Sequence, residues 1–485
     1  MKQFLKKPLG LAVAATLAMG GMAAFTSANA ATNANALGDL AIVPYYTVKN
    51  NFITGVQVIN TTNATQVVKM RLRRDNDSAD ILDFNVIMSP YDHFSGYISK
   101  VGDAVVFNTT DNTCTAPINS GTFTSPVPNL SAEADEGYIE VIGMGQASTE
   151  QMAVAIAAKH GATGAPLDCG FVESNFLIAN VTTNATTQGP AATAVAIGAN
   201  PASGITTWVD TPAEALKVSY FIRDGASGME MGDNATHISA FAAVPMMTNQ
   251  EGGGGLANGG VNGFDFPDLD GGGLNAANRG LYDSVIRLDL GATSILNNWS
   301  YNPANNVATD WVITIPGQYL MINPAGDTVA GNGDSIQTDI PVTAALIMYD
   351  REEDEQQGGS IVVSPGIPGG STALPHEVNV IEWGGKTVFG SDNAISANPA
   401  ASGINQPFGW ASLSLTSATN AASQDTAVIN AGLVIYDLTD PTGATNSAAA
   451  ALVNPVPVIG FAAWQRKFDA NADKNYGRIE AHSRM

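Results

Sequence analysis

The chain has 485 residues, 44 acidic and 21 basic side chains, a formal net charge of −23 at pH 7 and a hydrophobic fraction of 45%. That hydrophobic content excludes a disordered chain and is sufficient for the cores of two or three domains. The charge argues against a nucleic-acid partner, because nucleic acid repels an acidic protein without a basic patch.

Residues 1–30 have the features of a secretory signal peptide. Lysines at positions 2, 6 and 7 precede an apolar stretch over 9–25, and Ala28-Asn29-Ala30 is a small-x-small cleavage site. We therefore expect export, with a mature start at Ala31 and an extracellular or cell-surface location; the periplasm is the alternative. Loss of three lysines from a net charge of −23 leaves −26, which favours divalent counter-ions such as calcium. No later run is long and apolar enough to predict a transmembrane segment.

Short strands dominate residues 31–248 and predict a first β-sandwich domain. The clearest strand places Val68, Met70 and Leu72 on one face, and its basic neighbours Lys69, Arg71 and Arg73 on the other. This alternation predicts a half-buried strand of an antiparallel sheet, with its charged face in water.

An insertion in this first domain carries the one helix that the sequence predicts, over residues 148–160. Ser148 and Gln151 form a capping box at its start, and Gly161 ends it. Cys114 and Cys169 are the only cysteines, and an exported chain with two cysteines most simply forms one disulfide. A free thiol pair or a metal pair is the alternative.

Residues 249–280 are rich in Gly, Asn and Asp and predict a linker or a long surface loop. Within it, Asp265, Asp268 and Asp270 alternate with other residues before a glycine, an arrangement of carboxylates that suits calcium. The alternative is an acidic linker without a metal. Residues 281–485 then predict a second β-sandwich domain with a polar C-terminal tail.

Segments of the second half repeat segments of the first half in the same order. The matched pairs are 67–75 with 342–350, 83–87 with 377–381, 136–141 with 408–413, 220–224 with 433–437, and 239–244 with 459–464. Together with turn signals every 8 to 12 residues, they predict an all-β chain of two tandem antiparallel sandwiches related by an internal repeat. The pattern leaves immunoglobulin-like and jelly-roll topologies open.

The sequence contains no histidine or cysteine spacing typical of a zinc site, no nucleophile elbow and no phosphate loop. The densest acidic run, Glu352–Glu355, follows a predicted strand and is typical of a solvated turn. Among the tryptophans, Trp410 and Trp464 occupy matched strand positions, which predicts that they are core residues. Trp208 and Trp299 are therefore the candidates for stacking on a ligand such as a sugar.

Several stretches resemble a family of uncharacterised exported proteins of Gram-negative bacteria. The matching pieces are Val43–Asn50, Val58–Thr62, Leu82–Val86 with Ser89–Asp92, Thr309–Thr314 and Asp350–Glu353. The resemblance implies a secreted or surface location and brings no activity or active site with it. The family continues Val312-Ile313-Thr314 with Pro-Thr-Lys, whereas this chain has Ile315-Pro316-Gly317.

From these observations we predict a non-enzymatic cell-surface structural protein that assembles with copies of itself into a surface layer or filament. The first alternative is a monomeric adhesin that binds a surface glycan or a hydrophobic substrate, through the insertions at 143–215 and 352–375. The second alternative is a secreted hydrolase with a carboxylate site.

Overall fold

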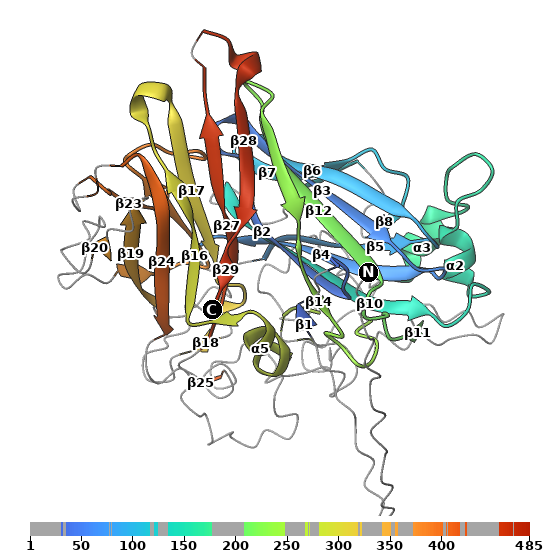
Figure 1. The fold of residues 1–485 in the computed structure, drawn as a ribbon. Coiled ribbons are helices and arrows are strands. Elements are labelled where there is room, and N and C mark those ends of the chain that lie inside the picture. Colours follow the sequence, from blue (N-terminus) through green and yellow to red (C-terminus); the bar gives the residue numbers. More distant parts are fainter. Residues whose placement is uncertain are drawn as a thin grey trace, which may run out of the picture.

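The structure is a computed structural model that describes residues 31–32, 35–76, 78, 80–116, 121–124, 134–176, 208–247, 267–269, 271, 281–318, 321–322, 342–350, 355–356, 372–400, 404, 406–417, 422–423, 455–468 and 470–485. These residues are mostly strands, as the alternation predicted, and they form four large sheets (Figure 1). The predicted signal peptide, Asp265 and Asp270 lie outside the described residues.

The first half forms sheets 1 and 2. Sheet 1 has the order β1 (Ala31–Thr32), β14 (Thr236–Ser239), β2 (Leu40–Thr47), β10 (Glu136–Ala147), β4 (Gln66–Arg74), β5 (Asp80–Met88) and β8 (Cys114–Ala116), with β11 (Trp208–Val209) also paired to β10. Sheet 2 has the order β13 (Glu230–Asn234), β12 (Leu216–Asp224), β3 (Phe52–Asn60), β6 (His93–Val101), β7 (Ala104–Thr109) and β9 (Gly121–Thr124). Phe84 of sheet 1 packs on Phe94, Phe107 and Phe123 of sheet 2, which makes the pair a sandwich.

The second half forms sheets 3 and 4. Sheet 3 has the order β20 (Glu355–Gln356), β19 (Val342–Asp350), β24 (Phe408–Ser417), β16 (Ser294–Ser300) and β29 (Ser483–Arg484), with β21 (Thr372–Leu374) also on β19. Sheet 4 has the order β23 (Ala394–Ala397), β22 (Val378–Trp383), β17 (Val307–Thr314), β27 (Ile459–Arg466) and β28 (Tyr476–Ala481). The pairing is antiparallel except between β22 and β23. Trp299 of sheet 3 stacks on Trp383 of sheet 4, with ring centroids 5.2 Å apart.

The remaining elements are short. Two-residue strands pair as β15 (Gly291–Ala292) with β26 (Val456–Pro457) and β18 (Met321–Ile322) with β25 (Ala422–Ser423). The α-helices are α2 (Ala153–Ala158), α3 (Cys169–Phe176) and α5 (Arg287–Asp289), which continues a π-helical turn over Tyr282–Ile286. Single 3-10 turns cover Lys49–Asn51, Pro303–Asn305 and Ala472–Lys474. None of these helices has the length and apolarity that crossing a membrane requires.

The predicted helix over 148–160 is shorter than expected. α2 begins at Ala153, and its N-cap residue Met152 makes no side-chain capping bond. The Ser148 hydroxyl instead faces the sulfur of Met152. The sequence also missed α3, which begins at Cys169 and lies in the same insertion.

The two sandwiches share one hydrophobic core. Sheet 4 packs on sheet 3 with one face and on the first half with the other, so it lies between them (Figure 1). Its Phe461 approaches Tyr45 and Tyr220 of the first half, with ring centroids 6.3 and 6.2 Å apart, and Phe389 packs 5.6 Å from Phe52. Buried residues of both halves consequently belong to one large cluster, and a separate small cluster lies under the insertion of the first half. We infer that the halves unfold together and not as independent domains.

Polar contacts reinforce the join between the halves. Ser391 donates a hydrogen bond to Glu136 Oε2 at 2.6 Å, and Asn50 Nδ2 donates to the carbonyl of Phe389 at 2.8 Å. Lys49 pairs with Asp392 and lies 3.7 Å from Glu136. Burial raises the pKa of Glu136, and the Ser391 hydrogen bond and the Lys49 charge oppose that rise.

Part of sheet 1 and part of sheet 3 have the same strand order, but not every matched segment lies in an equivalent strand. β14-β2-β10-β4-β5 in sheet 1 has the same layout as β29-β16-β24-β19-β20 in sheet 3. The segments 67–75 and 342–350 accordingly lie in β4 and β19. Segment 83–87, in contrast, lies in β5 beside β4, whereas its match 377–381 reaches β22 of the other sheet. The internal repeat stays a prediction.

The basic face of β4 is not in water, contrary to the expectation from its alternation. Lys69 is 0% exposed and Arg71 and Arg73 are 4% exposed, because the outer face of sheet 1 is covered. The insertion with α2 and α3 covers one end of this face, where Val67, Ile87 and Cys114 belong to its small apolar cluster. Nearer the middle, the carbonyl of Pro267 accepts a hydrogen bond from Arg71 Nη1 at 3.0 Å.

Candidate functional site

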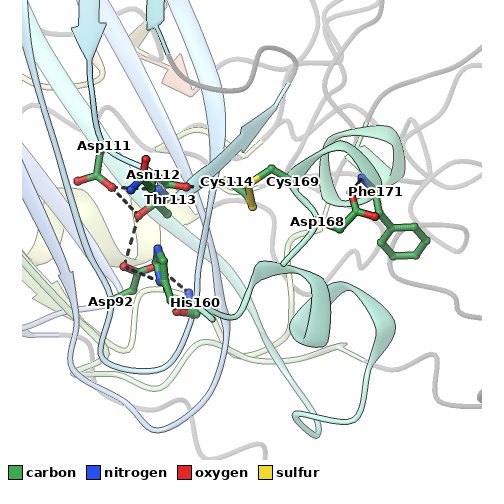
Figure 2. The surroundings of a disulfide bond; sticks show 10 residues. Asp92, Asp111, Asn112, Thr113, Cys114, His160, Asp168, Cys169 and Phe171 are labelled. Atoms are coloured by element: carbon green, nitrogen blue, oxygen red, sulfur yellow. Dashed lines mark hydrogen bonds and ion pairs between the residues drawn. A yellow bond between two sulfur atoms is a disulfide. The ribbon is translucent and has the colours of Figure 1, made fainter. Parts of the chain in front are cut away.

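The predicted disulfide is present between Cys114 on β8 and Cys169 at the start of α3 (Figure 2). It ties the helical insertion to the edge of sheet 1. Phe176 of α3 packs on Trp208, with ring centroids 6.4 Å apart. The disulfide and this packing hold the insertion against the sheet.

Asp92 and His160 lie near the disulfide (Figure 2). With Ser89 they form a Ser, His and Asp cluster that lacks the geometry of a catalytic triad. Ser89 Oγ and Asp92 Oδ1 both face Nδ1 of His160, at 3.2 and 3.7 Å. A nucleophilic relay needs the serine and the acid on opposite ring nitrogens. Burial raises the pKa of Asp92, and the nearby His160 opposes that rise. The cluster therefore joins the insertion to the turn between β5 and β6.

Trp208 and Trp299, the two predicted ligand contacts, are both buried and do not lie on an open face of the molecule. Trp208 is 9% exposed and belongs to the small apolar cluster of the insertion. Trp299 is 1% exposed and stacks between the sheets of the second sandwich. Trp299 fits there because Gly409 lies opposite it, where a Cβ atom would come within 2.8 Å of the indole ring.

Of the predicted calcium ligands, only Asp268 lies within the described residues. The backbone N–H and C=O of Asp268 each make a hydrogen bond with the backbone of Gly271. The adjacent Leu269 is 0% exposed. The segment is therefore packed against the protein at this point. No group of three or more metal-ligating side chains gathers within the part of the chain that the structure describes. Calcium stays a prediction.

The outer face of sheet 3 carries exposed aromatic side chains. Trp410 on β24 is 39% exposed and stacks on its cross-strand neighbour Tyr349 of β19, with ring centroids 4.0 Å apart and planes 8° from parallel. Phe408, two residues before Trp410 and on the same face, is 41% exposed. We call Tyr349, Phe408 and Trp410 the aromatic platform.

Small polar residues surround the aromatic platform. Trp410 has Tyr349 of β19 as its cross-strand neighbour on one side and Asn298 of β16 on the other. The Asn298 Nδ2 is 3.4 Å from Glu480 Oε2. Ser412 and Ser414 continue β24 on the same outer face, because alternate residues of a strand share a face. The face is thus aromatic at one end and rich in hydrogen-bonding groups beside it.

Further aromatic residues lie where β16 borders sheet 4. The indole nitrogen of Trp464 donates to Ser300 Oγ at 2.5 Å, and Ser300 is the cross-strand partner of Phe408. The ring centroids of Tyr476 and Trp464 are 5.3 Å apart, and Tyr476 is 47% exposed. Trp464 is half-buried, so the expectation of a core position is only partly met.

The prediction that Trp410 is a core residue is wrong, because Trp410 is 39% exposed. That prediction rested on the match between Trp410 and Tyr138. Its counterpart Tyr138 in β10 is 0% exposed, although both side chains point to the outer face of their sheets. The outer face of sheet 1 is covered, whereas Trp410 on sheet 3 is open. One signal was available: Gly409 and Ala411 are small enough to face a packed tryptophan, which leaves Trp410 for the other side.

Sheet 2 carries a second open face with a shallow groove of about 460 Å³. Its lining includes Gln57, Ser219, Phe221 and the edge-strand residues Gly232 and Asn234. The ring of Phe221 packs against Gly55, where a Cβ atom would be 2.1 Å from the ring. Tyr97, opposite Gly55 on β6, is 43% exposed. This groove is more polar than the aromatic platform and has no stacked ring pair.

Buried carboxyl groups hold loops in place away from these faces. Asp310 Oδ2 accepts hydrogen bonds from Thr387 Oγ1 and from the amides of Val388 and Phe389, at 2.8 to 2.9 Å. Burial raises the pKa of Asp310 to about 7, and these hydrogen bonds only partly oppose the rise. Burial likewise raises the pKa of Asp39 to about 7, where the carboxyl accepts from the amides of Phe241 and Ala242.

Comparison of this chain with models of known protein families, with curated proteins and with solved structures finds no match. The resemblance to exported Gram-negative proteins therefore stays a prediction. The geometry of the open faces is what bears on function.

Proposed function

We propose that this protein is an exported, non-enzymatic binding protein that holds a polysaccharide on the aromatic platform of sheet 3. The stacking of the half-buried Tyr349 on the exposed Trp410 carries this proposal. A pyranose ring presents C–H bonds on its flat face, and these pack well on an aromatic ring while its hydroxyl groups bond to polar neighbours.

The surroundings of the aromatic platform support a sugar over a purely apolar ligand. Asn298 supplies an amide on one side of Trp410, and Ser412 and Ser414 supply hydroxyl groups along β24. Phe408 and Trp410 are both exposed on the same face of β24, which suits an extended chain of sugar units. Export is supported by the disulfide, since such bonds persist in oxidising compartments.

Binding is tested by pulling the purified protein down with insoluble cellulose and chitin, and by affinity electrophoresis in gels that contain xylan, glucomannan, β-glucan or alginate. We expect retardation or co-sedimentation with at least one polymer, together with a change in tryptophan fluorescence. If the protein binds none of these polymers, the proposal is contradicted.

The sequence led us to expect self-assembly first. Self-assembly predicts a different behaviour for the aromatic platform. A second copy covering the aromatic platform would make sedimentation depend on protein concentration, without any added polymer. Analytical ultracentrifugation separates the two ideas: a monodisperse monomer that binds a polymer favours recognition, and concentration-dependent particles that do not bind one favour assembly.

A further inference from the structure

Lys69, Asp83 and Asn85 lie together on the covered outer face of sheet 1. Lys69 on β4 is the direct cross-strand partner of Asn85 on β5, and Asp83 is two residues before Asn85 on the same face. All three side chains are 0% exposed. Lys69 Nζ is 2.5 Å from Asp83 Oδ1.

The Asn85 amide is the unusual member of this group. Neither its Nδ2 nor its Oδ1 has a hydrogen-bond partner in the described structure, although the residue is completely buried. Buried polar groups in folded proteins are almost always hydrogen-bonded, because leaving them without a partner is destabilising. An unsatisfied amide beside a buried lysine calls for a chemical explanation.

The other cations of this face are paired in an ordinary way. Arg71 pairs with Asp80, and Arg73 Nε lies 3.0 Å from Glu140 Oε1. Guanidinium groups keep their proton in proteins, whereas a buried lysine ammonium can give its proton to a carboxylate and become a nucleophile. Lys69 is the one cation of this row that has this chemistry available.

We propose that Lys69 and Asn85 form a covalent amide bond between β4 and β5, with Asp83 as the acid–base group. Cβ atoms of directly opposed residues on neighbouring strands lie about 5 Å apart, so the Asn85 carbonyl carbon is within reach of the four-carbon side chain of Lys69. Fixing the two groups on one sheet replaces a collision between molecules with a local reaction.

The step balances without an oxidant or any other reagent. A proton passes from the Lys69 ammonium to the Asp83 carboxylate, and the neutral amine attacks the Asn85 carbonyl carbon. The bond from Lys69 Nζ to Asn85 Cγ forms, the bond from Cγ to Nδ2 breaks, and Nδ2 leaves as ammonia. Asp83 shuttles the proton from the attacking to the leaving nitrogen and ends protonated. The buried ion pair is thereby replaced by neutral groups, which a low-dielectric interior favours.

The bond would be a second covalent link on the same face. Cys114 lies opposite Ile87 on this face, one strand beyond β5, and its disulfide ties down the helical insertion. The amide would join β4 to β5, so that β4, β5 and β8 with its insertion would each carry a covalent connection. This inference is independent of the proposed polysaccharide binding.

The test is peptide mapping by mass spectrometry of the full-length purified protein after reduction and denaturation. Trypsin cannot cut after an acylated lysine, so we expect a branched peptide that joins residues 50–71 to residues 75–100 and is lighter by one ammonia than the sum of its parts. Fragmentation must place the link between Lys69 and Asn85. Normal cleavage after Lys69, with a linear 75–100 peptide, overturns the proposal, and so does a link to Asp83 with loss of water.

Two variants assign the roles and one controls for them. Asp83→Asn keeps both reacting groups and is expected to give soluble protein without the link; a link that still forms overturns the role of Asp83. Lys69→Met removes the nucleophile and the mass deficit with it. Lys217→Met removes a surface lysine that bonds to Asn234, and it must leave the branched peptide in place. The peptide map of the wild-type protein by itself shows whether the Lys69–Asn85 link is present. The proposal therefore remains testable even if a variant folds poorly.

Discussion

Replacing Trp410 by alanine is the most direct test of the aromatic platform. The residue is 39% exposed, and a tryptophan side chain that offers about 250 Å² in all therefore leaves about 100 Å² open for a ligand. At about 25 cal/mol per Å² of apolar area removed from water, that surface contributes about 2.5 kcal/mol to binding. Since 1.4 kcal/mol is tenfold in affinity, Trp410→Ala is expected to weaken binding roughly 60-fold.

The assay is affinity electrophoresis or calorimetry with the polymer that wild-type protein binds. The matched control is Tyr97→Ala, which removes an aromatic side chain of similar exposure, 43%, from the open face of sheet 2. Thermal melts must show that both variants remain folded. Equal loss of affinity in the two variants, or none in Trp410→Ala, refutes the assignment of the platform as the binding surface.

Four further predictions concern stability and calcium. Trp299→Ala, at a 1% exposed residue that stacks on Trp383, is expected to lower the free energy of unfolding by about 3 to 5 kcal/mol in a denaturant titration; a loss below that of Trp410→Ala contradicts its core role. Replacing both Cys114 and Cys169 by alanine opens a 55-residue loop and is expected to remove about 4 kcal/mol, with faster hydrogen exchange in α3; unchanged exchange there contradicts the tether. The pKa of Asp310 is raised to about 7 in the folded state from 3.8, so the folded state holds this proton more tightly and stability falls as pH rises from about 3.8 to about 7. Asp310→Asn keeps an acceptor oxygen and removes that loss, so denaturation midpoints at pH 5 and pH 8 should differ less in the variant than in the wild type; an equal difference argues against Asp310 as its source. Calcium binding by Asp265, Asp268 and Asp270 predicts heat in a calorimetric titration with millimolar calcium and none in the triple asparagine variant; no heat with the wild type removes the site.

Much of the fold was predictable because the side chains of a strand alternate between two faces. The pattern around Val68, Met70 and Leu72 located β4 and its inward face, and turn residues separated it from β5. The disulfide was predictable because the chain has only two cysteines, so no other thiol competes for either of them. Helix limits were less predictable: α2 and α3 are short and held by the disulfide and the apolar cluster, so local capping signals had little influence on where they begin.

What alternation leaves open is which face another part of the chain covers. Lys69 and Arg71 had the pattern of a solvated face, yet they are buried because a distant insertion and the segment at Pro267 lie over sheet 1. Tyr138 and Trp410 occupy matched positions, yet one is enclosed and the other open. The sequence by itself determined the strands, the sandwich class and the cysteine pair, because these follow from local periodicity and composition. The aromatic platform and the buried Lys69 cluster were decided by tertiary structure, since burial depends on contacts between residues far apart in the chain.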